Sequence, residues 1–84
     1  MKKSLHYTTW GTCSSAIDVE TEEGRIVNVR FTGGCHGNTQ GVSALLKGMR
    51  TEEAIARLEG IDCRGKGTSC PDQLARALRE LETR

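Results

Sequence analysis

The chain has few of the residues with which small proteins usually build a core. Of its 84 residues, 36% are hydrophobic and 4% are aromatic, the aromatic residues being Tyr7, Trp10 and Phe31. A domain of this size buries roughly 60 to 65% of the surface of its unfolded chain, so its core gives only marginal stability. We therefore expect a single domain, residues 1–84, with a further source of stability such as a metal ion, a disulfide or a partner surface.

An excess of charge of one sign and a long hydrophobic run are also absent. Twelve Lys and Arg residues stand against eleven Asp and Glu residues, whereas nucleic-acid-binding modules usually carry a clear basic excess. No apolar stretch approaches the ~20 residues of a membrane span, and no apolar region of a secretory signal follows the basic start MKKSLH. We therefore expect a cytoplasmic protein that binds neither nucleic acid nor membranes directly.

The hydrophobic pattern of the first half predicts an antiparallel sheet. In AIDVETEEGRIVNVRFTGG, residues 16–34, apolar and polar residues alternate on both sides of Glu23-Gly24, which predicts a β-hairpin. The buried face of its second strand is expected to hold Val27, Val29 and Phe31. The β-rich stretch LHYTTWGT, residues 5–12, predicts a third strand.

Helical spacing replaces this alternation in the second half. A helix is predicted over residues 38–49, and a second begins at the capping residue Thr51 and ends at Gly60. Ser69 or Cys70 begins the last one. The residues expected to face inward are Val42, Leu45, Leu46 and Met49 in the first helix and Leu74, Leu78 and Leu81 in the last. Because the strands precede the helices, the predicted class is α+β, a small antiparallel sheet with about three helices packed on one face.

The four cysteines lie at element ends and in a loop rather than on the predicted buried faces. Cys13 and Cys35 flank the hairpin and should lie near each other, and a folded-back loop would bring Cys63 and Cys70 to the same place. Cys35 and Cys70 each precede a helix, where backbone N–H groups favour the thiolate form that binds metals and reacts. Four thiolates complete a tetrahedral zinc site. The predicted metal ligands are therefore Cys13, Cys35, Cys63 and Cys70.

Other interpretations of these thiols stay open. They fit incidental thiols with no metal, or a disulfide that joins Cys13 to Cys35 or Cys63 to Cys70. His36, which follows Cys35, is an auxiliary candidate that could replace Cys63 as a ligand. A second auxiliary candidate is Asp72, which is also explained as a first-turn residue of the last helix.

Three stretches closely resemble the TSCPD domain family: TSCPDQL (68–74), FTGGCHGNTQGVSALLKGM (31–49) and WGTCS (10–14). Members of this family occur as small stand-alone bacterial proteins and as a C-terminal module of some ribonucleotide reductases, notably cobalamin-dependent ones. The resemblance implies an accessory role, either as a cysteine-bearing metal or redox module or as an interaction module for a protein partner in nucleotide metabolism. It implies no reductase activity for the chain alone, because a reductase needs a large barrel.

The chain is also similar, more weakly, to the U-type iron–sulfur scaffold proteins. These share the order of a cysteine, a hairpin, a cysteine before a helix, and a cysteine that opens the last helix. The similarity implies an iron–sulfur or zinc site on Cys13, Cys35 and Cys70, and a partner in iron–sulfur metabolism. Ser14-Ser15 stands where the scaffolds have an aspartate ligand, and Cys63 is additional. A fourth thiolate favours stable zinc over cluster transfer.

Together these features predict a small metal-binding accessory domain with zinc as its cofactor. The alternatives are an iron–sulfur or persulfide scaffold, and an interaction module associated with ribonucleotide reductase. The sequence holds neither a Ser-His-Asp constellation nor a phosphate-cradling loop followed by Lys-Ser/Thr. We therefore do not expect the chain to be an enzyme on its own.

Overall fold

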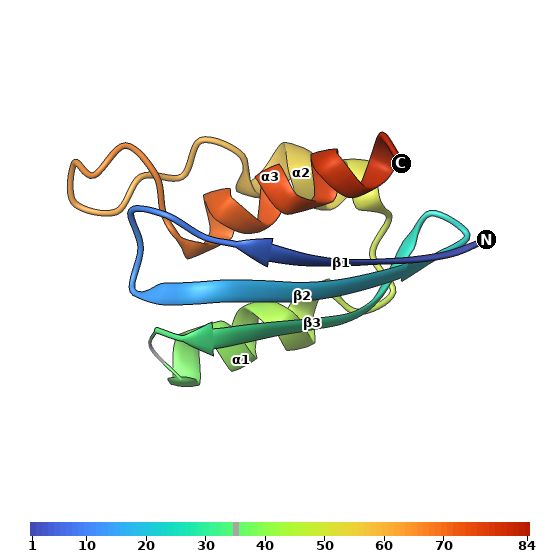
Figure 1. Ribbon diagram of the computed structural model, residues 1–84, viewed down its shortest axis with the longest axis horizontal. Coiled ribbons are helices and arrows are strands. Elements are labelled where there is room, and N and C mark those ends of the chain that lie inside the picture. Colours follow the sequence, from blue (N-terminus) through green and yellow to red (C-terminus); the bar gives the residue numbers. More distant parts are fainter. Residues whose placement is uncertain (35) are drawn as a thin grey trace.

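The alternating pattern of residues 16–34 folds into the predicted hairpin, and a third strand and three helices complete the architecture (Figure 1). The computed structural model describes residues 1–34 and 36–84. The elements are β1 (Lys2–Thr8), β2 (Ser14–Glu22), β3 (Arg25–Gly33), α1 (His36–Leu46), α2 (Thr51–Leu58) and α3 (Cys70–Glu82). The strands form one antiparallel sheet in the order β1-β2-β3. The α+β prediction is confirmed.

The tight turn between β2 and β3 is formed by Glu23 and Gly24, which both have positive φ, at 53° and 77°. Two positive φ values match the twist of the flanking strands. The strand predicted over residues 5–12 is displaced, since β1 begins at Lys2 and ends at Thr8. Residues 9–13 form the loop after β1, and Trp10 in this loop contacts α3, as described below.

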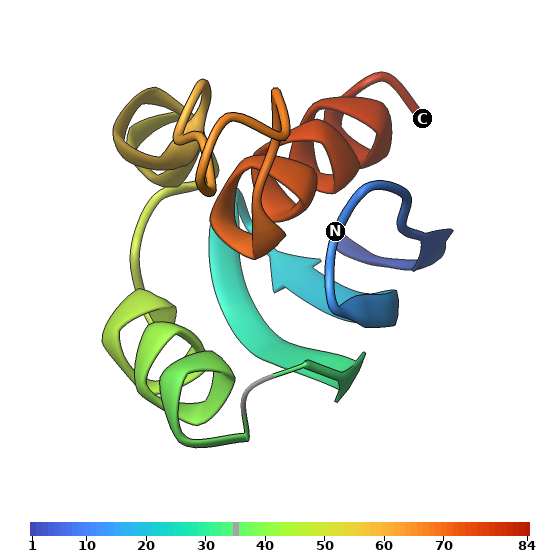
Figure 2. The same cartoon turned by 90° about the vertical axis from the view of Figure 1, so that its left-hand side faces the viewer.

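All three helices lie on one side of the curved sheet (Figures 1 and 2). Helix α1 packs on β3, while α3 packs on β1 and β2 with α2 beside it. The core between the layers comprises Ile17, Val19, Ile26, Val29, Leu46, Ala54, Ile55, Leu74, Leu78 and Leu81. The buried leucine stripe predicted for α3 is therefore confirmed. In the described part of the chain no helix is long and apolar enough to cross a membrane.

Two residues expected in the core are exposed. Val27 is 41% exposed because a β-bulge interrupts the pairing of β2 with β3, so that Ile26 faces the core instead. Leu45 is 79% exposed, whereas its neighbour Leu46 is buried. Helix α1 contacts the sheet along a narrow stripe, and Leu45 lies outside it.

The ends of α1 and α2 also differ from the prediction for a physical reason. Helix α1 ends at Leu46 because the next residues pair with β3: the N–H of Gly48 donates to Ile26 O at 2.8 Å, and that of Ile26 donates to Met49 O at 2.9 Å. Thr51 is not the cap of α2 but its first residue. It is buried, and its hydroxyl donates to Gly24 O at 2.9 Å, which ties α2 to the hairpin turn.

Candidate functional site

The stretch TSCPD forms the beginning of α3. Ser69 has extended backbone and is the N-cap residue: its Oγ accepts the N–H of Asp72 at 3.1 Å and donates to Ile61 O at 2.6 Å. Pro71 follows Cys70 in the first turn, where its missing N–H costs nothing because that N–H would have no partner within the helix. The cap therefore fixes Cys70 as the first residue of the helix.

Asp72 lies beneath this turn, 2% exposed, and its carboxylate accepts three hydrogen bonds. The donors are the N–H of Gly60 at 2.7 Å, the hydroxyl of Thr68, and Nε of Arg76 at 3.0 Å. Burial by itself raises the pKa of Asp72, but the hydrogen bonds and the Arg76 charge outweigh it, so that the pKa lies below its ordinary value. Asp72 is a buried, ionised anchor for the segments on either side of the loop.

Gln73 connects α3 to the loop between β1 and β2. Its side chain is fully buried: Nε2 donates to Thr68 Oγ1 at 2.9 Å, and Oε1 accepts the N–H of Trp10 at 3.2 Å. The guanidinium of Arg76 lies 4.9 Å from the centre of the Trp10 ring, a cation–π geometry. Residues 10–13 are thus held against the start of α3.

The close approach of Cys70 to β2 results from a second irregularity in the sheet. The pairing of β2 with β3 shifts register between Ser14 and Ala16, and bulges of this kind redirect side chains. Ser14 is buried there, with its Oγ 3.3 Å from the sulfur of Cys70. The residue before Ser14 is Cys13, so this contact brings a second thiol to the start of α3.

The loop that carries Cys63 folds back toward the same helix end. Asp62 accepts the N–H groups of Gly65 and Gly67, an arrangement typical of tight polar turns. The N–H of Cys63 donates to Thr68 O at 3.0 Å. The fold-back on which the four-cysteine prediction depended is therefore present.

The thiols of Cys13, Cys63 and Cys70 line one open groove of about 540 Å³ between α1 and the start of α3. Cys13 and Cys63 are exposed, Cys70 is half-buried, and all three are free thiols, so Cys63 and Cys70 form no disulfide. Cys35 lies outside the described residues. Among residues 1–34 and 36–84, no group of three or more His, Cys, Asp or Glu side chains is positioned to hold a metal ion.

The sequence model of the TSCPD domain family matches residues 1–82. The chain belongs to the TSCPD domain family. Comparison with curated proteins and with solved structures found no match. The structure gives each residue of the TSCPD stretch a place. Thr68 bridges Asp72 and Gln73, and Ser69 caps the helix. Cys70 begins the helix and lines the groove, and Pro71 and Asp72 follow it in the first turn.

The two auxiliary residues lie away from the thiol groove. His36 faces a different groove, between α1 and β3, where its Nε2 lies 2.6 Å from Nε2 of Gln40. Asp72 is engaged with three donors inside the α3 network. Of the residues predicted for the site and described in the structure, Cys13, Cys63 and Cys70 come together, and His36 and Asp72 do not join them.

Sequence reasoning did not find Gln73, Thr68 and Ser14, the residues that position the thiols. A signal for Gln73 was present, because it is a polar residue next to Leu74 and one turn before Ala77, two apolar positions of the helix. A polar side chain in such a stripe needs a partner. The identity of that partner, a backbone N–H 63 positions away, depends on the tertiary fold.

Proposed function

We propose that this TSCPD domain is a zinc-binding accessory domain, in which the thiolates of Cys13, Cys35, Cys63 and Cys70 hold one Zn²⁺. The observation that carries the proposal is that three cysteines line one groove, Cys13 from the loop after β1, and Cys63 and Cys70 from the loop before α3 and the start of that helix. Cys35 completes the set as the sequence predicts. Thiolate sulfur is the donor that zinc and other soft metals prefer, and four of them give a closed structural site rather than an open catalytic one.

The position of Cys70 suits a metal ligand. It is the first residue of α3 and is half-buried at the groove that Cys13 and Cys63 also line. Cys13 and Cys63 are exposed, so their side chains can turn toward a shared ion without disturbing the core. Gly34, the residue before Cys35, also lies close by, since a Cβ at Gly34 would be 3.4 Å from Ser14 N.

Stability gives a reason for such a site. The core consists of small and medium aliphatic side chains in an 84-residue chain, and cores of this size give little excess stability. A structural zinc ion contributes on the order of 10 kcal/mol in small domains. Zinc binding between α1, the loop with Cys63 and α3 would therefore stabilise the fold where few core side chains reach.

Native mass spectrometry of protein purified anaerobically without chelator, with elemental analysis and a free-thiol count, tests the proposal. We expect one zinc per chain and four thiols that react only after chelation. Cys→Ser at any one ligand should lower metal content and melting temperature together, with Ser15→Ala, an exposed position next to the site, as the control. Bound iron with sulfide would instead support the scaffold alternative. Absence of metal, or normal metal content and melting in all four variants, would contradict the proposal.

A further inference from the structure

The basic residues of this chain are distributed unevenly, although the whole chain is nearly neutral. Residues 24–51 contain no Asp or Glu and four Arg or Lys residues. The remaining residues therefore carry eight basic side chains against eleven acidic ones. The uniformly basic segment comprises β3, α1 and the turn into α2, so its charge is concentrated in one part of the fold.

A second groove of about 560 Å³ lies between the two main elements of this segment. Strand β3 contributes Asn28, Arg30 and Phe31, and α1 contributes His36, Gln40, Ser43 and Lys47. None of the described residues that line it is acidic. The groove therefore combines two permanent cations with amide and hydroxyl groups, and Phe31 gives it one apolar wall.

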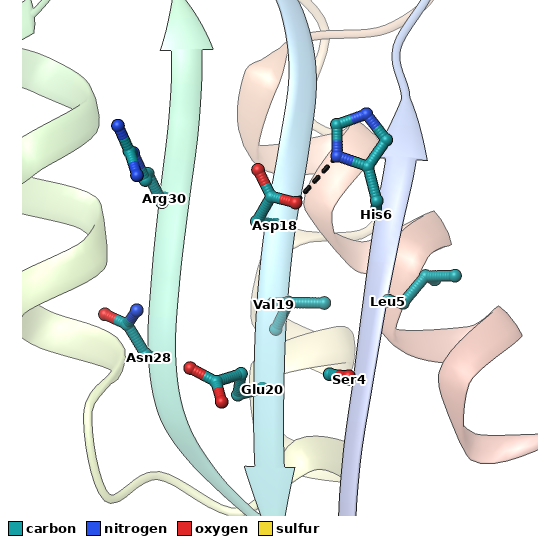
Figure 3. A pocket seen from close by; sticks show the side chains of 8 residues that line it. All are labelled: Ser4, Leu5, His6, Asp18, Val19, Glu20, Asn28 and Arg30. Atoms are coloured by element: carbon teal, nitrogen blue, oxygen red, sulfur yellow. Dashed lines mark hydrogen bonds and ion pairs between the residues drawn. The ribbon is translucent and has the colours of Figure 1, made fainter.

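The two cations of this groove are free to bind a ligand. Within residues 1–34 and 36–84, neither Arg30 nor Lys47 forms an ion pair. Asp18 is the register partner of Arg30, but its carboxylate is 2.6 Å from Nδ1 of His6 instead. Figure 3 shows the groove on the open face of the sheet, which Arg30 and Asn28 line together with Asp18 and Glu20. In this view the Arg30 side chain is directed away from Asp18 and His6, toward the outer edge of β3.

The basic residues of α2 and α3 provide the contrast. Each is paired with a carboxylate: Arg57 with Glu53, Arg76 with Asp72, and Arg79 with Glu59. Arg84, just after α3, pairs with Glu80. Among the described residues, Lys3, Arg25, Arg64 and Lys66 also form no ion pair. Arg30 and Lys47 differ from these four because they line one groove together, and the described lining of that groove contains no acidic residue. This arrangement favours an anion at the groove.

From this arrangement we infer that the groove between β3 and α1 binds a multivalent anion that carries a phosphoryl group. The planar guanidinium of Arg30 matches two phosphate oxygens, and the ammonium of Lys47 adds a second charge from the facing helix. Asn28, Gln40 and Ser43 offer N–H and O–H donors. The volume suits a small ligand, and the phosphoryl group belongs either to an inorganic oligophosphate or to a phosphate ester whose organic part contacts Phe31.

The test is titration of ¹⁵N-labelled protein, followed by NMR, with inorganic pyrophosphate and separately with phenyl phosphate at constant ionic strength. We expect saturable shifts of amides in β3 and α1. Arg30→Gln with Lys47→Gln should weaken binding about tenfold or more. The matched control, Arg57→Gln with Arg84→Gln, removes the same charge from ion-paired positions and should leave the affinity unchanged. If the double variant Arg30→Gln with Lys47→Gln does not fold, Lys47→Gln alone replaces it, and we expect it also to weaken binding.

The relative affinity of the two probes identifies the source of the anion. Tighter binding of pyrophosphate indicates an inorganic oligophosphate, and tighter binding of phenyl phosphate indicates an ester that uses Phe31. Absence of saturable shifts, or equal weakening in the control variant, would overturn the inference. Removal of a metal ion by pyrophosphate would affect all variants alike, so the result is independent of the zinc proposal.

Discussion

The side chain of Gln73 accepts a hydrogen bond from the backbone N–H of Trp10 at 3.2 Å, across 63 positions of the sequence. This contact joins the motifs WGTC and TSCPD, each of which contains a cysteine of the candidate site. Through it, the loop that presents Cys13 is fixed relative to the helix that presents Cys70. The geometry of the thiol groove therefore depends on a buried amide that touches neither thiol.

Gln73→Met tests this dependence. Methionine keeps most of the volume but leaves the Trp10 N–H and the Thr68 hydroxyl without their partner, which should cost about 1 to 3 kcal/mol in the free energy of unfolding. Urea denaturation measures that loss. In chelator-treated protein, Cys13 should also be alkylated faster, while Cys63, in a separate loop, should not change. Gln40→Met, at an exposed position, is the control. Unchanged Cys13 reactivity in a destabilised Gln73→Met would refute the positioning role.

Asp72 predicts a specific response to acid. Its pKa is lower in the folded protein than the value of about 3.9 expected in the unfolded chain. The ionised carboxylate therefore contributes its full stability above about pH 4, and this contribution is lost as the pH falls through the folded-state pKa.

Asp72→Asn should remove this contribution. At pH 7 we expect a loss of about 2 to 4 kcal/mol in the free energy of unfolding, because the buried site is built for a charged acceptor. The difference from the wild type should shrink below about pH 4, where Asp72 itself becomes protonated. Urea midpoints at a series of pH values measure both effects, with Glu82→Gln, at an exposed position, as the control. A difference that stays constant down to pH 2 would contradict the assignment.

Alanine substitutions at two glycines distinguish the cost of backbone strain from the cost of a close contact. Gly11 and Gly24 have similar positive φ, 70° and 77°, but a Cβ at Gly11 would lie 3.0 Å from Thr68 Cγ2, whereas Gly24 has nothing within 4 Å. Gly24→Ala should cost only the strain of a left-handed alanine, about 1 to 2 kcal/mol. Gly11→Ala should cost more and also lower metal affinity, since it pushes residues 10–13 off α3. Equal melting temperatures for the two variants would argue against that close contact.

The neighbours Leu45 and Leu46 test the face that α1 turns to the sheet. Leu46→Ala should cost about 2 to 4 kcal/mol because a buried leucine leaves a cavity. Leu45→Ala should change the free energy of unfolding by less than about 0.5 kcal/mol, as expected of an exposed side chain. Chemical denaturation of both variants measures these changes. A large loss of unfolding free energy in Leu45→Ala would mean that α1 turns a different face to the sheet.

Local patterns predicted those parts of the fold that local forces determine. The Glu23-Gly24 turn, the start of α3 at Cys70 and the leucine stripe of α3 depend on backbone conformation and on periodicity within a few residues. Val27 and Leu45 were placed wrongly because a bulge and the contact line of a helix depend on packing between elements. The observed ends of β1 and α1 differ from the predicted ones for the same reason. Backbone groups just beyond these ends form hydrogen bonds with residues far away in the sequence.

The candidate site was partly predictable for similar reasons. Hairpin closure was enough to place Cys13 near Cys35, and a glycine-rich loop was enough to direct Cys63 and Cys70 toward the same region. In the structure Cys13, Cys63 and Cys70 line one groove. The means of their positioning, through Gln73 and Ser14, was not visible, because each acts across 56 to 63 positions of sequence. The two auxiliary residues were suggested by adjacency along the chain, which does not determine which groove a side chain faces.

Zinc K-edge X-ray absorption on the protein as purified decides whether the four cysteines hold a zinc ion. We predict one zinc per chain with four sulfur neighbours at about 2.3 Å. In Cys63→Ser, one of the four sulfur neighbours should be lost. Zinc neighbours that are mainly nitrogen or oxygen would contradict the zinc proposal. So would a metal-free protein that folds and has the same melting temperature as the protein as purified.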